Sequence, residues 1–322
     1  MIPFKRLNFS GAKEEVNKLL ESGFIGLGNK VFEFEQKLAE YLDCKYVIAT
    51  DSCTSALFIC LKYENPRTVV IPSMTVPLVA NAVLEAGCEL KFNDNAGWVG
   101  SAYNLWNTNI YDSAHQLERN MMSKTITNDK IKYCFSFYPT KIIGSADGGA
   151  IATNDIDFAE WARSVITYGR NQTQKYQNSW EYDTQRLGYK RHYTNLQAAI
   201  CIEQLERLDE TNKKRKMIRD KFNDAFGLKN KSLYLYRINI YKDDAERRNK
   251  FIKNMAVDGI ECGVHFKPLH LMNAFKFIHF IEASRPYEVV REYNETVSLP
   301  IYDNLTEAEQ DLIIKKVKKH TR

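Results

Sequence analysis

We predict an α/β protein in which helices cover both faces of a mainly parallel sheet, followed by a smaller α/β unit. Short apolar runs rich in β-branched residues alternate with amphipathic helical patterns through the first half of the chain. Parallel neighbours need a crossover connection, usually a helix, so this alternation is typical of that fold class. The runs that predict strands cover residues 46–49, 68–71, 89–92, 109–111, 133–137 and 150–153.

The helical patterns lie between and after these strands. Apolar residues at helical spacing predict helices over residues 31–42, 56–63 and 78–86. A long helical pattern over 195–226 then leads into a C-terminal unit, so we predict a large domain over residues 1–210 and a small domain over 211–322. In the small domain we expect strands over 233–240 and 261–266, and helices over 245–258, 286–293 and 306–320.

Composition excludes several classes of protein. The chain has 322 residues, of which 44% are hydrophobic and 26% charged, as in an ordinary globular protein. The net charge of +5 is scattered without a concentrated basic stripe, so we expect no nucleic-acid partner. The longest uncharged stretch, residues 68–84, is short for a membrane span and contains Pro72 and Pro77, so we expect no membrane segment.

The seven cysteines form no Cys-x-x-Cys pair and are irregularly spaced. We therefore predict reduced thiols, no structural metal site and a cytoplasmic location. The first residues carry no apolar signal-peptide core, which agrees with that location.

Three polar segments follow predicted strands, where open parallel sheets place ligands. Residues 51–55 (Asp-Ser-Cys-Thr-Ser) open a helix, and such an N-terminus binds anions, although a plain cap by Ser52 or Thr54 is the common alternative. Asp112 closes a buried strand, where a carboxylate is either functional or a structural cap. Both readings stay open for these two segments on the residues alone.

Lys141 lies in the third segment, beside an apolar run and ahead of a glycine-rich turn over residues 144–149. A partly desolvated lysine amine has a lowered pKa and can act as a nucleophile. The alternative is a surface lysine whose stem packs on apolar neighbours.

Several ordered motifs resemble the DegT/DnrJ/EryC1/StrS family of sugar aminotransferases, which use pyridoxal phosphate (PLP) and have the type I aminotransferase fold. That fold implies a large domain with a seven-stranded type of sheet and a smaller C-terminal α/β domain. Agreement in order along most of the chain is far more specific than one short motif. The motifs cover residues 22–28, 34–35, 71–75, 80–83, 135–155, 194–199, 204–209, 264–270 and 298–300.

The resemblance implies a role for each matching residue. Lys141 matches the lysine that binds PLP covalently and then shuttles a proton, and Asp112 matches the carboxylate at the pyridine nitrogen. Ala114 would pack on the ring, and His115, at a position often held by Gln, would hydrogen-bond the ring hydroxyl. The phosphate would be held by Cys53 through its backbone, and by Thr54, Ser55 and Ser136.

The resemblance also implies a homodimer, in which Lys190 of one subunit reaches the phosphate in the other. Lys190 stands where the family has Asn, and Val76 stands where the family usually has an aromatic residue on the ring. Cys53 replaces a frequent Gly. Only about 18 residues separate Asp94 from Asp112, where the family usually places a loop, a helix and a strand, so the chain is a compact variant.

The implied activity is transfer of an amino group from an amino acid, L-glutamate by family analogy, to a keto group of a nucleotide-linked sugar in amino-sugar and surface-glycan biosynthesis. The block over residues 194–209 looks closest to enzymes that aminate GDP-linked 4-keto-6-deoxy sugars. Two alternatives stay open: a PLP- or pyridoxamine-phosphate-dependent sugar dehydratase, against which Lys141 argues, and a non-catalytic regulator that kept the fold. His265 and His270 are candidates for the sugar pocket, with a structural role as the alternative.

Overall fold

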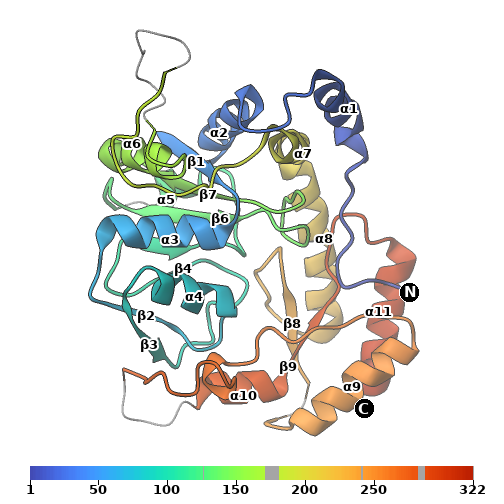
Figure 1. Cartoon of the computed structure of the whole chain (residues 1–322). Helices are drawn as coiled ribbons and strands as arrows, with labels where there is room; N and C mark the ends of the chain where they lie inside the picture. The colour runs from blue at the N-terminus through green and yellow to red at the C-terminus, as the bar shows by residue number, and fades with distance from the viewer. Residues whose placement is uncertain (126, 171–180, 241, 282–286, 322) are drawn as a thin grey trace.

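The computed structural model describes residues 1–125, 127–170, 181–240, 242–281 and 287–321. It confirms the α/β class (Figure 1). Within the described residues, five strands form one sheet in the order β1-β7-β6-β5-β4, and β2 and β3 form a separate parallel pair. In chain order the elements before the C-terminal unit are η1 (Ser10–Ala12), α1 (Lys13–Ser22), α2 (Asn29–Leu42), β1 (Tyr46–Thr50), α3 (Cys53–Glu64), β2 (Thr68–Pro72), α4 (Pro77–Glu85), β3 (Glu89–Asn93), β4 (Tyr103–Asn104), β5 (Ile110–Asp112), α5 (Met121–Thr125), β6 (Lys132–Ser136), β7 (Gly149–Thr153), α6 (Ile156–Val165) and α7 (Asn195–Glu206).

The five-stranded sheet is mixed, which corrects the prediction of a mainly parallel sheet. β5 and β6 are parallel, but β7 lies antiparallel between β1 and β6, and β4 is antiparallel to β5. The chain passes from β6 to β7 through residues 137–148 without a helix, and a connection of that kind returns the next strand antiparallel to its neighbour. The two sheets meet at an isolated bridge between Val70 and Trp106.

Both faces of the five-stranded sheet are buried. Alternate residues of β6 and β7 belong to different cores: Cys134 and Ile151 pack with α3, whereas Phe135 and Ala150 pack with α2 and α7. This alternation follows from the two-residue period of a strand. Figure 1 shows α3 on one side of β6 and β7, with α2 and α7 on the other.

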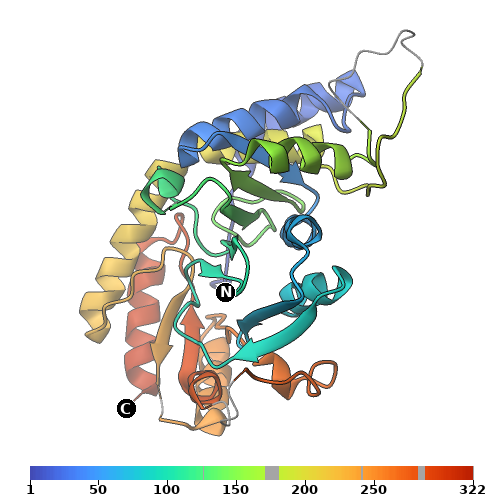
Figure 2. The same cartoon turned by 90° about the vertical axis from the view of Figure 1, so that its left-hand side faces the viewer.

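The C-terminal unit has its own core, built on a short antiparallel sheet. Figure 2 shows α8 and α11 side by side, to the left of its two strands. Its elements are α8 (Leu208–Phe226), β8 (Tyr236–Asn239), α9 (Ala245–Val257), η2 (Leu269–Leu271), α10 (Glu288–Glu295), β9 (Thr296–Leu299) and α11 (Glu307–His320). The long helical pattern over 195–226 is thus two helices that meet at Arg207.

One expectation for this unit was wrong, and one strand was not predicted. Residues 261–266 do not form a strand and contribute only the bridge between Gly263 and Ser298. The strand that pairs with β8 is β9 instead, and the sequence prediction missed it. The predicted boundary after residue 210 remains a prediction, and the N-terminus crosses it: Ile2 forms a bridge with Ile260 and belongs to the C-terminal core.

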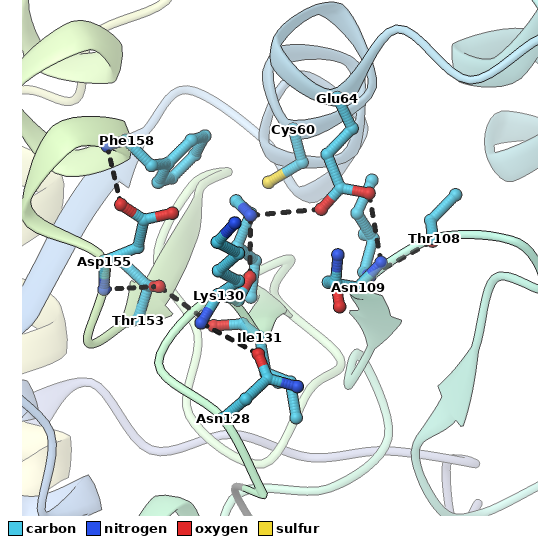
Figure 3. A network of polar contacts seen from close by, with 12 residues as sticks. Cys60, Glu64, Thr108, Asn109, Asn128, Lys130, Ile131, Thr153, Asp155 and Phe158 are labelled. Carbon is cyan, nitrogen blue, oxygen red and sulfur yellow. Dashed lines mark hydrogen bonds and ion pairs between the residues drawn. The ribbon is translucent and has the colours of Figure 1, made fainter.

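The position of α3 is fixed at its C-terminal end by a buried ion pair (Figure 3). Lys132 of β6, only 1% exposed, donates from Nζ to Glu64 Oε1 at 3.0 Å and to the carbonyl of Lys130 at 2.7 Å. Glu64 Oε2 accepts the backbone N–H of Asn109 at 3.0 Å. Each buried charge therefore has partners, and α3 is tied to the starts of β5 and β6.

Among the described residues, no helix combines the length and apolar character that a bilayer crossing needs.

Candidate active site

A cavity of about 590 Å³ opens where β5, β6 and the first turn of α3 come together. Asp112 and Lys141 both line it. The two groups on which the sequence argument depended therefore share one cavity. The lining residues are Ser52, Cys53, Thr54, Leu57, Val76, Leu78, Val79, Asp112, Ala114, Ser136, Tyr138, Thr140, Lys141, Asp147, Tyr234, His265 and Phe266.

The first turn of α3 provides backbone donors on one side of the cavity. Ser52 is the N-cap, and its Oγ accepts the N–H of Ser55 at 3.1 Å. Cys53 and Thr54 are the first two residues of α3, so their N–H groups have no carbonyl acceptor within the helix. Because both residues line the cavity, this end of α3 can bind an anion.

Gly149 lets β7 approach this helix end. A Cβ at Gly149 would lie 2.4 Å from the backbone nitrogen of Cys53 and 2.6 Å from the carbonyl oxygen of Ser52. Any other residue would push the start of α3 away from the sheet. The glycine-rich turn of the sequence thus sets the position of the anion site.

Asp112 reaches the cavity because of the strand period. Ile110 of β5 packs in the core shared with α3, and Asp112, two residues on, lies on the same face. Burial raises the pKa of the Asp112 carboxyl above its usual value. The N–H of Ala114 at 2.9 Å, the charge of Lys141 and a hydrogen bond with Tyr103 act in the opposite direction and favour the carboxylate.

Lys141 sits in the loop between β6 and β7, which α7 holds in place. The loop closes through the hydrogen bonds Phe137 N–H to Gly148 O at 2.8 Å and Ser145 N–H to Phe137 O at 2.9 Å. Two glutamines of α7 bind its backbone: Gln204 accepts the Gly144 N–H at 3.1 Å, and Gln197 donates to Asp147 O at 3.0 Å. The lysine is therefore carried by a braced loop.

Tyr234, from the segment before β8, forms the next part of the wall. Its ring lies 4.8 Å from Lys141 Nζ and 4.4 Å from Lys5 Nζ. Lys5 donates to the carbonyl of Ile301 at 3.0 Å, and burial, followed by the charges of Arg215 and Lys141, lowers its pKa well below the usual value. The N-terminal segment thus adds a second amine behind the cavity wall.

His265 is the predicted sugar-pocket residue that lines the cavity. Its Nδ1 is 2.9 Å from Ser298 Oγ, and its ring stacks on Phe4 at 5.1 Å between centroids. Burial, with the charges of Lys5 and Lys141, lowers the pKa of His265 to about 3. The imidazole is neutral at physiological pH and can exchange hydrogen bonds with a bound hydroxyl.

Four predicted site residues are not among the described residues that line the cavity. Ser55 is buried behind it and accepts a hydrogen bond from Arg191 Nη1 at 3.0 Å. His115 accepts the N–H of Gly100 on Nδ1 at 3.2 Å and stacks on Trp98. His270 bonds Ser73 Oγ at 2.6 Å. Lys190 is exposed, in a bridge with Thr167.

The sequence reasoning missed several cavity residues. Leu57 and Val79 could have been predicted from helical spacing. Leu57 lies one turn after Cys53 on α3, and Val79 lies one turn after Val76, the N-cap of α4. Cys53 and Val76 also line the cavity. Phe266 lies within a motif that had been noted only for its histidines. Tyr234 carried no local signal, since only the tertiary structure brings it to Lys141.

The cavity fits PLP. It combines an amine, a buried carboxylate and the open turn of a helix, which are the three groups that the aldehyde, the pyridine nitrogen and the phosphate require. Leu57, Val76 and Val79 supply apolar contact for a flat ring. No cluster of three potential metal ligands occurs in the described part of the chain.

Fold and site together define a PLP-dependent aminotransferase. The sequence model described as the DegT/DnrJ/EryC1/StrS aminotransferase family matches residues 10–97 and 102–318, and the chain belongs to this family. The gap in that match, residues 98–101, falls in the short segment between β3 and β5.

Named relatives cover nearly the whole chain. It is 26% identical to the spore coat polysaccharide biosynthesis protein SpsC of Bacillus subtilis, over 95% of this chain and 93% of that protein. It is 25% identical to GDP-perosamine synthase of Caulobacter vibrioides, over 89% of each. A sugar aminotransferase of Streptococcus pneumoniae described as putative, Spr1654 in its PLP form, has the same fold, with a TM-score of 0.85 at 23% identity over 99% of this chain and 98% of that one.

Proposed function

We propose that this enzyme moves an amino group from an amino acid, L-glutamate, to the keto group of a nucleotide-linked 4-keto-6-deoxy sugar, in the synthesis of amino sugars for surface glycans. One observation carries the proposal: Lys141 and Asp112 face the same cavity at the first turn of α3. The relatives named as GDP-perosamine synthase and as UDP- and dTDP-sugar transaminases support the class of acceptor.

The residues divide the chemistry among them. When bound, PLP supplies an electron sink for the carbon that loses its proton. Lys141 Nζ takes the Cα proton from the amino donor and, in the second half of the reaction, delivers a proton to the sugar carbon that receives nitrogen. Asp112, as a carboxylate, would stabilise positive charge on the nitrogen of the heterocycle.

Other residues bind and orient. The N–H groups of Cys53 and Thr54, with the hydroxyls of Thr54 and Ser136, would hold the phosphate. Ala114 and Val76 would contact the ring from the cavity walls. His265, neutral and fixed by Ser298, is placed to hydrogen-bond a sugar hydroxyl.

We also propose that the enzyme works as a homodimer in which Lys190 reaches the phosphate of the partner subunit. Two apolar residues at the cavity, Leu78 and Tyr138, are 56% and 52% exposed. A second subunit over this face would cover them and close the cavity. Lys190 is exposed and free to reach outward, and it would contact the phosphate as a point charge.

We propose a cytoplasmic location as well. All seven cysteines are free, including Cys60 and Cys134, whose sulfur atoms lie 3.7 Å apart without a disulfide. Reduced thiols in contact are typical of a reducing compartment.

A panel assay tests the proposed reaction. The PLP-loaded enzyme is incubated with L-glutamate and with GDP-, UDP- and dTDP-linked 4-keto-6-deoxy sugars, and amino-sugar nucleotide and 2-oxoglutarate are measured by mass spectrometry. We expect both products in equal amounts with at least one acceptor, and neither product from Lys141→Ala. Loss of the sugar hydroxyl without 2-oxoglutarate would instead support the dehydratase, and no turnover with any donor and acceptor would support the non-catalytic regulator.

A further inference from the structure

The short segment between β3 and β5 places a tyrosine hydroxyl beside the Asp112 carboxylate. Tyr103 of β4 is the antiparallel partner of Asp112 in β5. Both side chains are buried, with 6% and 4% of their surfaces exposed. The Tyr103 hydroxyl lies 3.1 Å from Thr75 Oγ1, within hydrogen-bond distance, and its interaction with the Asp112 carboxylate acts to lower the pKa of that acid.

The direction of these hydrogen bonds follows from the chemistry of the groups. A carboxylate only accepts hydrogen bonds, so of these two neighbouring side chains Tyr103 is the one that can donate, with its hydroxyl turned toward Asp112. The tyrosine oxygen is then free to accept, and the fully buried Thr75 donates to it. The result is a chain of two donors, Thr75 to Tyr103 to Asp112, that ends on the carboxylate.

Packing holds the tyrosine in this position. Its ring lies against Trp98, with centroids 4.3 Å apart. Trp98 in turn stacks on His115 at 5.3 Å and on Phe266 at 6.2 Å, and Phe266 lines the cavity. The ring of Tyr103 is therefore held by Trp98, which does not line the cavity and is itself packed on both sides.

We propose that Tyr103 is a positioning residue of the active site, which orients the Asp112 carboxylate toward the bound cofactor and keeps it ionised. This inference rests on the proposed function, because it assigns Tyr103 a role toward PLP. Tyr103 is not a lining residue of the cavity, so it acts through Asp112.

The need for such a donor follows from the surroundings of Asp112. The ionisable groups that influence it are Lys141, Cys53, Cys134 and Tyr103. Cys134 is buried and Cys53 is half-buried at the cavity, and desolvation raises the pKa of each thiol, so both stay neutral. Besides Lys141 and the N–H of Ala114, Tyr103 is the group that stabilises the charge of this buried acid.

The test compares Tyr103→Phe with wild type and with a matched control. Tyr103→Phe removes the hydroxyl and keeps the clamped ring. Tyr236→Phe is the control, because Tyr236 is equally buried and its hydroxyl donates to Asn223 Oδ1 at 3.0 Å in the C-terminal unit, away from the cavity. Thr75→Val removes the outer donor of the chain with little change in shape.

The measurements are the dissociation constant of PLP and the pH dependence of the visible absorbance of the bound cofactor. We expect Tyr103→Phe to weaken PLP binding by about tenfold, the effect of one lost hydrogen bond to a charged group. Its absorbance midpoint should shift along the pH axis, because the charge beside the heterocycle changes. Thr75→Val should show smaller changes in both measurements, and Tyr236→Phe should match wild type.

The outcomes separate this inference from the proposed function. If wild type binds PLP and Tyr103→Phe matches it in affinity and in absorbance midpoint, the positioning role is refuted while the proposed function stands. If Tyr103→Phe and Tyr236→Phe weaken binding equally without a spectral shift, Tyr103 is merely structural and the inference is again refuted. If wild type binds no PLP, the proposed function fails, and this inference fails with it.

Discussion

At the scale of single residues, burial decides which groups around the cavity carry charge. It raises the pKa of Asp112 and lowers the pKa of His115 and His265. The two histidines are therefore neutral, and the positive charges nearest the carboxylate come from lysine. A neutral His265 is suited to bind a hydroxyl rather than to compete with Lys141 for protons.

His265 contributes to the pH dependence of stability. Its pKa is about 3 in the folded protein, against an ordinary value of 6.5. Between these values the unfolded chain binds a proton that the folded protein does not, so the free energy of unfolding falls as the pH drops from about 6.5 toward about 3. Above pH 6.5 His265 is neutral in both the folded and the unfolded state, so its contribution to the free energy of unfolding no longer changes with pH.

Urea unfolding of wild type and His265→Gln at pH 7 and pH 5 measures this effect. We expect wild type to lose more of its unfolding free energy than the variant when the pH is lowered, because glutamine does not titrate. An equal loss in both proteins would show that His265 is protonated in the folded state, contrary to its burial beside Lys5 and Lys141.

At the scale of helices and strands, α3 matters most for the site, because its first turn brings the anion-binding N–H groups to the ends of the strands. The Ser52 cap sets its first turn, and the ion pair between Glu64 and Lys132 sets its last. Removing Lys132 leaves the partly buried Glu64 carboxylate with the Asn109 N–H as its partner, so the cost should be about 3 kcal/mol, the lower end for a broken buried ion pair.

We therefore expect Lys132→Met to lower the free energy of unfolding by about that amount, measured by denaturant titration. The double variant Glu64→Gln with Lys132→Met should recover part of the loss, since no unpaired charge remains. A single variant as stable as wild type would mean that the pair is solvated and does not anchor α3.

Elements were predictable where a local pattern decides them. β1, β2 and β3 each begin where a strand was predicted and extend one residue beyond it, and Thr306, with the capping box of α11, marks the start of the last helix. β4 was not predictable, because it has two residues and exists only by pairing with β5. The site shows the same limit of local patterns. Cys53, Asp112 and Lys141 lie at or after the ends of predicted strands and could be found from the sequence. Tyr103 and Tyr234 reach the site only through tertiary contacts, which no local pattern indicates.

At the scale of the whole molecule, the chain alone leaves the cavity open on a face with exposed apolar residues. The proposed homodimer closes that face and supplies Lys190. Subunit mixing tests the arrangement, because in a twofold dimer each site would take Lys141 from one subunit and Lys190 from the other.

Lys141→Ala and Lys190→Ala are each expected to be strongly impaired as purified proteins. After they are unfolded and refolded together, half of the dimers should be mixed and carry one intact site, giving about a quarter of the wild-type activity. The control is each variant refolded alone. Activity of the mixture no greater than the mean of the two controls would contradict a shared site, and a monomer in analytical ultracentrifugation would contradict the dimer itself.

The central claim is that the Lys141 amine binds the cofactor in the cavity that it shares with Asp112. Borohydride treatment of the PLP-loaded protein, followed by peptide mass spectrometry, tests it most directly. We expect one modified peptide, with the added cofactor mass on Lys141, and no modification of Lys5 or Lys190. Attachment at another lysine, or none at saturating PLP, would contradict the account.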